Sequence, residues 1–543
     1  MAQRSNGEGT GSAAGSPRPG GFPSGRELIV IAKSETGLRA RPEGVTSVTG
    51  TDVVPLRDLL ASEGATLQPL FGASEERLTA EADRLVTTGA EEVPDLSVYY
   101  RVEGPEERLD DLAESLRQMD EIEAAYVKPP AELPTHATVQ PTKPTRFRLN
   151  QLAPAAAESP AATPNFTARQ DYLERAPEGI DANFASSRPG GRGADVNIID
   201  IEWGWRFNHE DLVQNQGGIV SGTGSTDLRS ENHGTAVIGE FSGDRNTFGI
   251  TGISPAATVS AVSLETHSTS QAITIAANRL RPGDIMLLEV HRAGPRWPPA
   301  FPPDTQFGFI AVEWWPDDFA AIRFAVSKGV IVVEAGGNGG QNLDDPIYDR
   351  SQTGFPPSWR NPFDPANPSS GAVVVGAGNP PAGTHGRNAQ PAVGEPYVDR
   401  ARCYFSNYGA RVDTQGWGWE VTSTGYGDLQ GGSNRDLWYT DQFSGTSSAS
   451  PIVVGALACV QGVLRRRGKT PLSPARAQEL LRSTGSPQQD GPGFTFTPGH
   501  PGGGWPPTNY PARPATERIG NRPNLRQLLD RVDDDDDDDD DDE

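Results

Sequence analysis

The sequence lacks the features that mark membrane proteins and disulfide-rich secreted proteins. No run of about 18 consecutive apolar residues occurs, so we expect no membrane-spanning helix. Cys403 and Cys459 are the only two cysteines; they allow at most one bridge, and the sequence leaves their pairing open. Residues 1–20 are rich in glycine and serine and contain no apolar segment. We therefore see no secretory signal peptide and expect a cytoplasmic location unless another export route operates.

Positive charge is also scarce. The chain has 47 Lys and Arg against 72 Asp and Glu, which gives a formal net charge of −25. Such a chain repels phosphate backbones, so nucleic acid is not expected as a partner. Residues 533–543 are all acidic, and we predict a solvated, disordered tail over residues 531–543.

The first part of the chain predicts a small separate domain. Residues 1–25 contain few apolar residues and are expected to be disordered. The region 26–130 then follows the order β-α-β-β-α-β, with elements expected at residues 28–32, 55–62, 67–71, 96–102, 109–119 and 124–127. This order predicts a ferredoxin-like α+β domain. Repeated prolines break up residues 131–164, which we interpret as a linker between two domains.

Residues 165–530 alternate short apolar runs with helical stretches. Strands are expected at residues 196–199, 259–264, 285–290, 330–333 and 372–375. Helices are expected at residues 233–241, 270–280, 317–327 and 451–464. Continuously apolar strands that alternate with helices predict an α/β fold with a doubly wound, mostly parallel sheet that is covered on both faces.

Three polar residues stand out at the ends of these elements. Asp200 follows the strand at 196–199, where catalytic groups collect in parallel sheets, although an aspartate there can equally cap a helix. His233 precedes Gly234, and a lone histidine is more often structural. Ser447 begins an apolar helix, whose free N–H groups suit an oxyanion, or a simple N-cap. Taken together, the order Asp200, His233, Ser447 is one of the known chain orders of the acyl-transfer triad.

These residues lie in segments that resemble one family, the subtilisin-like serine peptidases or subtilases. The resemblance spans roughly residues 165–529. It is carried by the segments IIDIEWGW…HEDL (198–212), NHGTAVIGEFSG (232–243), VIVVEAGGNGG (330–340), YFSNYGARVDTQGWG (404–418) and FSGTSSASP (443–451). The serine segment is the most specific of them.

The resemblance implies a role for four residues. Ser447 would be the nucleophile, and His233 would take its proton and later give it to the leaving amine. Asp200 would hold the imidazole in the right tautomer. The side-chain amide of Asn338, with the Ser447 backbone N–H, would bind the developing oxyanion. The resemblance thus implies a serine endopeptidase that hydrolyses peptide bonds.

The resemblance also implies how the rest of the chain is used. The domain at 26–130 would be a propeptide that inhibits the enzyme, so the protein would be made as a zymogen. The expected partners are a protein or peptide substrate and this propeptide. No cofactor is required; calcium often stabilises the family, but we place no calcium site and predict no metal ligands. The alternative is a catalytically silent subtilase fold that serves as a binding module.

Several residues depart from the family pattern near the expected cleft. Glu289 and His291 stand where small residues are usual, and Glu334 lies within an apolar strand. With Gly336 and Gly337, which would let a substrate backbone come close, we predict that these residues bind substrate. If both glutamates face the cleft, they favour a basic residue before the scissile bond. The competing account is that Arg292 or Arg323 pairs with them, which would make them structural.

A Pro- and aromatic-rich insertion follows at residues 296–315. Loops of this length are commonly functional or disordered. Its tryptophans, Trp297, Trp314 and Trp315, form either a lid over the substrate or anchors in the core, and the sequence does not favour one over the other.

Overall fold

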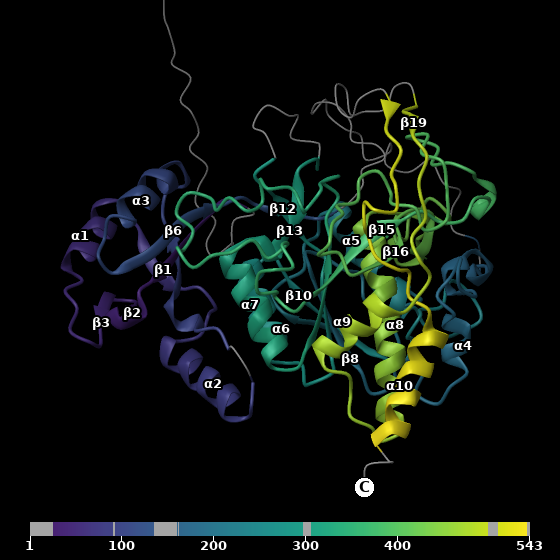
Figure 1. The fold of residues 1–543 in the computed structure, drawn as a ribbon, viewed down its shortest axis with the longest axis horizontal. Coiled ribbons are helices and arrows are strands. Elements are labelled where there is room, and N and C mark those ends of the chain that lie inside the picture. Colours follow the sequence, from purple (N-terminus) through teal and green to yellow (C-terminus); the bar gives the residue numbers. More distant parts are fainter. Residues whose placement is uncertain are drawn as a thin grey trace, which may run out of the picture.

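A seven-stranded sheet organises the larger part of the chain (Figure 1). The computed structural model describes residues 25–90, 93–134, 160, 162–296, 306–497 and 509–539. The strand order is β16 (Thr414–Trp417), β15 (Val373–Gly378), β14 (Ile331–Ala335), β11 (Ile285–Leu288), β8 (Asn197–Glu202), β10 (Thr258–Ser263), β9 (Gln216–Ser221). All six pairings are parallel, as predicted.

The five apolar strands were predicted and the two edge strands were not. β9 has the sequence QGGIVS and is largely exposed, so hydropathy does not mark it. β16 has the sequence TQGW and is buried despite two polar residues. Edge strands pair on one side only, and their burial depends on what covers them, which a local pattern does not encode.

Helices cover both faces of the sheet. α5 (Leu228–Ser242) and α8 (Thr446–Arg466) lie on one face, where the α8 side chains pack against Ile285 and Leu287. α6 (Thr269–Ala277) and α7 (Pro316–Ser327) lie on the other, against Met286 and Leu288. This alternation along β11 is the period-2 pattern of a strand that is buried on both faces. Further elements are α4 (Ala182–Ser186), α9 (Pro474–Ser483), α10 (Leu525–Asp539), β17 (Val421–Thr424), β18 (Tyr439–Phe443), β19 (Phe494–Thr495) and β20 (Asn509–Tyr510).

Within the described residues, α8 is the one helix that is long and apolar enough to span a membrane, and all of its most apolar stretch is buried inside the fold. Its burial against the sheet makes it the central core helix. Both cysteines are free and buried, Cys459 in this helix and Cys403 elsewhere in the same core.

The N-terminal domain contains a four-stranded antiparallel sheet in the order β4-β5-β1-β6, which is the ferredoxin-like arrangement. Its predicted elements are β1 (Glu27–Ala32), α1 (Val54–Ser62), β4 (Thr66–Pro69), β5 (Tyr99–Glu103), α3 (Leu109–Leu116) and β6 (Ile122–Lys128). Helix α2 (Glu75–Thr87) and the hairpin of β2 (Leu38–Arg41) and β3 (Gly44–Ser47) were not predicted from the sequence. All three are largely polar, so their apolar pattern is weak.

The N-terminal domain packs on the α6–α7 side of the larger sheet (Figure 1). One face of its sheet buries α1 and α3 in a core of its own. The other face contributes Ile29, Ile31 and Tyr126 to the core that contains α6 and α7. The Lys128 ammonium is fully buried there between Asp317 and Asp318 at the start of α7. The two domains therefore share an apolar core and a buried ion network.

Two predicted boundaries are corrected by the structure. The linker expected at 131–164 begins later, because Ala131–Glu132 forms strand β7 and residues 133 and 134 are buried. The remainder of the linker up to residue 159 lies outside the described residues. The acidic tail expected from residue 531 also begins later, since α10 continues to Asp539. Val532 is buried, and an Arg467–Asp533 ion pair joins the first acidic residue to the end of α8.

Candidate active site

The fold brings four polar residues together at the carboxyl ends of the parallel strands. β8 ends at Glu202, α5 carries His233, and α8 begins just before Ser447. Asn338 lies in the glycine-rich segment after β14. These four side chains are almost completely buried. Carboxyl ends of adjacent strands meet at one edge, which is why segments more than 200 residues apart converge there.

The partner of His233 is Glu202. The resemblance implied Asp200 for this role, so that prediction is wrong. Nδ1 of His233 lies 2.7 Å from Oε2 of Glu202. Asp200 Oδ2 instead accepts a hydrogen bond of 2.7 Å from the indole N–H of Trp205. Asp200 and Glu202 are two residues apart on β8 and share one face, but Glu202 is at the strand end, nearer to α5.

The signal that identifies Glu202 is a pair of glycines. A Cβ on Gly234 would come within 2.2 Å of the Gly204 carbonyl oxygen. The backbone after Glu202 therefore touches the residue after His233, which sets the carboxylate beside the imidazole. Each glycine alone is unremarkable in the sequence, and only their contact shows which acidic residue reaches the histidine.

Burial controls the ionisation of this cluster. It lowers the pKa of His233 to about 3, so the imidazole is neutral. It raises the pKa of Glu202 well above its ordinary value. The pKa of Asp200 is raised by burial and then by the neighbouring Glu202 charge. The site thus holds a neutral base and carboxyl groups that retain protons easily.

A segment of the chain itself occupies the site. The carbonyl oxygen of Pro134 accepts a 2.9 Å hydrogen bond from Oγ of Ser447 and a short one from Nδ2 of Asn338. The Asn338 amide is held from behind, because its Oδ1 accepts from the backbone N–H (2.9 Å) and the hydroxyl (3.0 Å) of Thr446. A Cβ on Gly445 would lie 2.6 Å from the same carbonyl oxygen, so only glycine leaves room for it. Among the described groups, Nε2 of His233 has no hydrogen-bond partner, because the Ser447 hydroxyl points to Pro134.

The residues before Pro134 enter the site as an added strand. β7 pairs antiparallel with β12 (His291–Ala293), which in turn pairs with β13 (Phe309–Ala311). Nε2 of Gln306 donates a 2.6 Å hydrogen bond to the carbonyl oxygen of Leu133. Oε1 of Gln306 accepts from Nδ2 of Asn338 at 3.3 Å. Gln306 therefore joins the bound segment to the asparagine, although no sequence pattern marked it as a site residue.

Of the residues predicted to bind substrate, only His291 lies beside the bound segment, where it pairs with Glu132 of β7. It forms β12, and its Nδ1 accepts from the backbone N–H of Asn338 at 3.3 Å. Gly336 and Gly337 do not face the segment. A Cβ on Gly336 would meet the Val375 carbonyl oxygen at 2.7 Å, and one on Gly337 would meet the Asn407 amide at the same distance. These two glycines allow close packing inside the protein.

The two glutamates lie on opposite faces of the sheet, so they do not form one acidic pocket. Glu289 points to α8, where it accepts a short hydrogen bond from the hydroxyl of Ser450, three residues after Ser447. Glu334 is paired with Leu288, on the α7 face, and accepts a 3.1 Å hydrogen bond from the backbone N–H of Glu313. The cation beside these residues is Arg411, whose guanidinium lies 2.9 Å from the carboxylate of Glu313. Arg292 binds Asp318 instead.

The second half of the insertion at 296–315 anchors the core. Trp314 and Trp315 are fully buried and pack edge to face with ring centroids 5.4 Å apart. The indole N–H of Trp314 donates to the Tyr348 carbonyl oxygen at 3.1 Å. Trp297 lies outside the described residues. The two described tryptophans are core anchors and not a lid.

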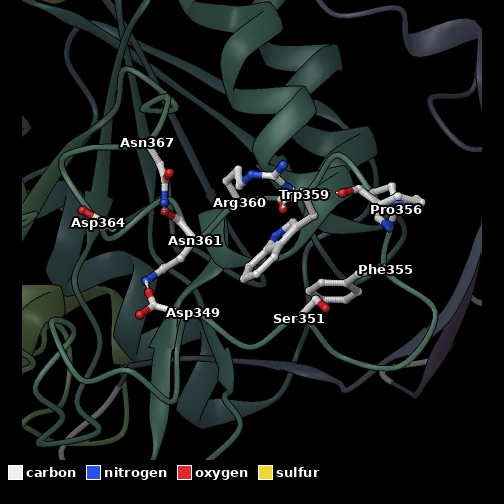
Figure 2. A pocket seen from close by; sticks show the side chains of 10 residues that line it. Asp349, Ser351, Phe355, Pro356, Trp359, Arg360, Asn361, Asp364 and Asn367 are labelled. Carbon is white, nitrogen blue, oxygen red and sulfur yellow. Dashed lines mark hydrogen bonds between the residues drawn. The ribbon is translucent and has the colours of Figure 1, made fainter.

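A cavity of about 440 Å³ lies away from these residues, in the loop that follows β14 (Figure 2). Asp349, Asn361 and Asn367 line one side, with Asn361 donating to Asp349 at 2.8 Å. Phe355 and Trp359 line the other. None of its lining residues belongs to the His233 cluster, so it is not part of the candidate active site.

Comparison with known proteins supplies the context for this arrangement. Residues 193–500 match the family model described as the subtilase family. Subtilisin amylosacchariticus of Bacillus subtilis subsp. amylosacchariticus and subtilisin E of Bacillus subtilis (strain 168) are each 24% identical over 296 residues. These matches cover 53% of this chain and 62% of each relative. The chain thus spans less than two thirds of the length of these relatives.

Among solved structures, fervidolysin from Fervidobacterium pennivorans, titled a keratinolytic enzyme related to subtilisin, superposes with a TM-score of 0.48 and 15% identity. That match covers 95% of this chain and 62% of fervidolysin. The epidermin leader peptide processing serine protease of Staphylococcus aureus has the same TM-score and identity over 93% of this chain and 98% of its own.

Proposed function

Because this chain belongs to the subtilase family, we propose that it is a serine endopeptidase whose own N-terminal domain fills the active site until it is cleaved off. One observation supports this most directly. The Pro134 carbonyl oxygen accepts a hydrogen bond from the Asn338 amide, the donor expected for a scissile carbonyl, and one from the Ser447 hydroxyl, which places the proposed nucleophile beside that carbonyl group. The bond after Pro134 is then the first to be cut.

The geometry supports a definite sequence of proton transfers. Ser447 Oγ attacks the carbonyl carbon while its proton passes to Nε2 of His233, which is free to accept it. Glu202 holds Nδ1–H of His233 and stabilises the imidazolium. The Asn338 amide binds the oxygen as it becomes negative. The proton then leaves with the amine, and water releases the acyl group by the reverse path.

The substrate we propose is a protein or peptide in extended conformation. Residues 131–134 bind as a strand added to β12, a common mode of peptide recognition in which main-chain hydrogen bonds supply affinity. Gln306 would bind the carbonyl of the second residue before the cut, as it binds Leu133. The basic preference expected from paired glutamates loses its basis, since Glu289 and Glu334 are on opposite sheet faces and the bound residue is proline.

Two measurements test the proposal. Intact mass should show that the wild-type protein loses its residues up to Pro134, whereas the Ser447→Ala variant stays whole. A fluorophosphonate probe should then label the processed wild type at Ser447. The alternative, a silent binding module, predicts that both proteins stay intact and that neither is labelled. Processing that is equal in both proteins would mean that another protease makes the cut.

A further inference from the structure

Asp200 is a fully buried carboxyl group to which the proposed mechanism gives no role. It lies two residues before Glu202 on the same face of β8, which places the two carboxyls side by side, and after burial the Glu202 charge raises the pKa of Asp200 further. Oδ1 of Asp200 and Oε1 of Glu202 receive no donor from any other group that the structure describes. Each carboxyl therefore has one satisfied oxygen and one that only its neighbour can satisfy.

The surroundings supply too little positive charge for two carboxylates. Within the described residues, Glu202 has one ion-pair partner, His233, which burial keeps neutral. The other groups that interact with the pair are the Trp205 indole, the Tyr426 phenol and the Glu289 carboxyl. Arg229, at the exposed start of α5, lowers the pKa of His233 further after burial. Two fully buried carboxyls side by side on one strand face, with no cation between them among the described residues, do not both ionise readily, so one of them keeps its proton.

We propose that Asp200 retains this proton and donates it to the Glu202 carboxylate, so that a carboxyl pair orients His233. Asp200 is then a positioning residue, and the inference rests on the proposed peptidase function. The proton belongs on Asp200 because Glu202 faces Nδ1 and gains most from negative charge when His233 becomes imidazolium. The indole N–H of Trp205 accounts for the other oxygen of Asp200.

The consequence is a longer chain of hydrogen bonds behind the nucleophile. It runs from Trp205 through Asp200 and Glu202 to His233. The donor on Asp200 keeps Glu202 ionised at lower pH than burial alone would allow. The hydrogen bond from Asp200 also holds the Glu202 carboxylate in place, although glutamate has one more rotatable side-chain bond than aspartate. Asp200 and Glu202 together would thus align His233 as well as a single aspartate in the position of Glu202 would.

Two variants of Asp200 distinguish a residue that donates a hydrogen bond to Glu202 from one that only fills space. Asp200→Asn keeps a neutral donor for Glu202 and an acceptor for Trp205, whereas Asp200→Leu removes both. We expect kcat of the Asn variant within about 3-fold of wild type. We expect kcat of the Leu variant to fall about 10-fold to 100-fold at unchanged KM, since it leaves a buried oxygen unsatisfied. Glu334→Gln, which removes a buried carboxyl outside the site, is the matched control.

The pH profile of kcat gives the second measurement. Without its donor, the pKa of Glu202 rises, so the acid limb of the Leu variant should move to higher pH, while that of the Asn variant stays in place. An ionised Asp200 predicts the opposite for Asn: loss of its charge lowers the pKa of His233 and moves the acid limb down. Such a shift overturns the proposal, as does equal activity of Asn and Leu. If the Leu variant does not fold, the Asn profile decides alone.

A third measurement does not depend on activity. The infrared difference spectrum of wild type minus Asp200→Asn should contain the carbonyl band of a buried protonated carboxyl, and its absence refutes the protonated Asp200. If the wild-type protein cleaves no peptide and reacts with no fluorophosphonate, the proposed function fails and this spectrum still judges the carboxyl pair. If the probe labels Ser447 but the band is missing, only the carboxyl pair is wrong.

Discussion

Two sets of buried carboxyl groups in this protein have opposite surroundings. The set around His233 consists of Asp200, Glu202, Glu240 and Glu289, all fully buried. Its members have no Lys or Arg ion-pair partner among the described residues, and both oxygens of Glu240 lack a hydrogen-bond donor. The set at the start of α7 consists of Asp317 and Asp318, and the Lys128 ammonium and the Arg292 guanidinium neutralise it.

In the first set burial favours the protonated form of each carboxyl, whereas in the second set cations pair with the carboxylates. Burial raises the pKa of Glu240 and Glu289 well above the ordinary range, and no Lys or Arg among the described residues pairs with them. At α7, burial also opposes ionisation, yet Lys128 brings the pKa of Asp317 below its ordinary value, while burial and then the Asp317 charge raise the pKa of Asp318 to about 6. Burying an acidic group without a cation lowers the stability of a fold, and such groups occur mainly at functional sites. The paired set anchors one domain on the other.

The largest effect should come from Glu202→Gln. The amide cannot hold the Nδ1–H tautomer or stabilise the imidazolium, so kcat should fall by about 10⁴-fold, the loss seen when an aspartate of another serine-protease triad becomes asparagine. Thermal unfolding should change little, because Glu202 supports no ion pair with Lys or Arg among the described residues. Peptide hydrolysis and calorimetry on the same protein check both halves. A variant with a tenth of wild-type activity would remove Glu202 from the triad.

Lys128→Met should have the reverse outcome, with stability lost first. It leaves Asp317 and Asp318 buried with one cation fewer, which should lower the free energy of unfolding by about 3–5 kcal/mol. Denaturant unfolding in a Ser447→Ala background, which keeps the chain whole, measures this. An effect below about 1 kcal/mol would mean that the ion network does not anchor the domain.

Lys328→Met is the matched control for that variant. Lys328 reaches Glu81 on α2 at 2.6 Å across the same interface, but the pair is partly exposed and should contribute less than about 1 kcal/mol. Hydrogen bonds from Arg84 and then Lys328 lower the pKa of Glu81 from 4.5 to about 2. The contribution is therefore present above about pH 4.5 and lost as the pH falls toward 2.

Asn338→Leu should lower kcat by about 10²-fold to 10³-fold with little change in KM, because the amide stabilises charge that exists only in the transition state. Steady-state kinetics on the processed enzyme distinguish this from a binding role. A change confined to KM would show that Asn338 holds the ground-state carbonyl only.

The smallest effect should come from Gln306→Ala. Its loss removes one hydrogen bond to the bound chain, which corresponds to about a 10-fold decrease in kcat/KM at most. The decrease should vanish for substrates in which the backbone carbonyl of the second residue before the cut, the counterpart of Leu133, is replaced by a methylene. If the same loss persists with that substrate, Gln306 acts through Asn338 alone.

Much of the fold could be predicted from the sequence because it depends on local pattern. The apolar runs at β8, β11, β14 and β15 are buried on both faces and mark themselves by composition alone. Ser447 and His233 belong to segments whose local sequence is specific. Strands β9 and β16, helix α2 and the start of the bound segment at 131 have no such pattern, since their burial depends on distant neighbours.

The sequence by itself predicted a nucleophile, a base and an oxyanion donor in the chain order of the acyl-transfer triad, and it determined that a parallel sheet would bring their segments to one edge. Only the tertiary structure decided which carboxyl reaches His233, because Asp200 and Glu202 share one strand face and differ by a strand end that the Gly204–Gly234 contact sets. The tertiary structure also decided that Glu289 and Glu334 lie on opposite faces of the sheet. Adjacent strands offer two faces, and a shift of one residue in register sends a side chain to the other.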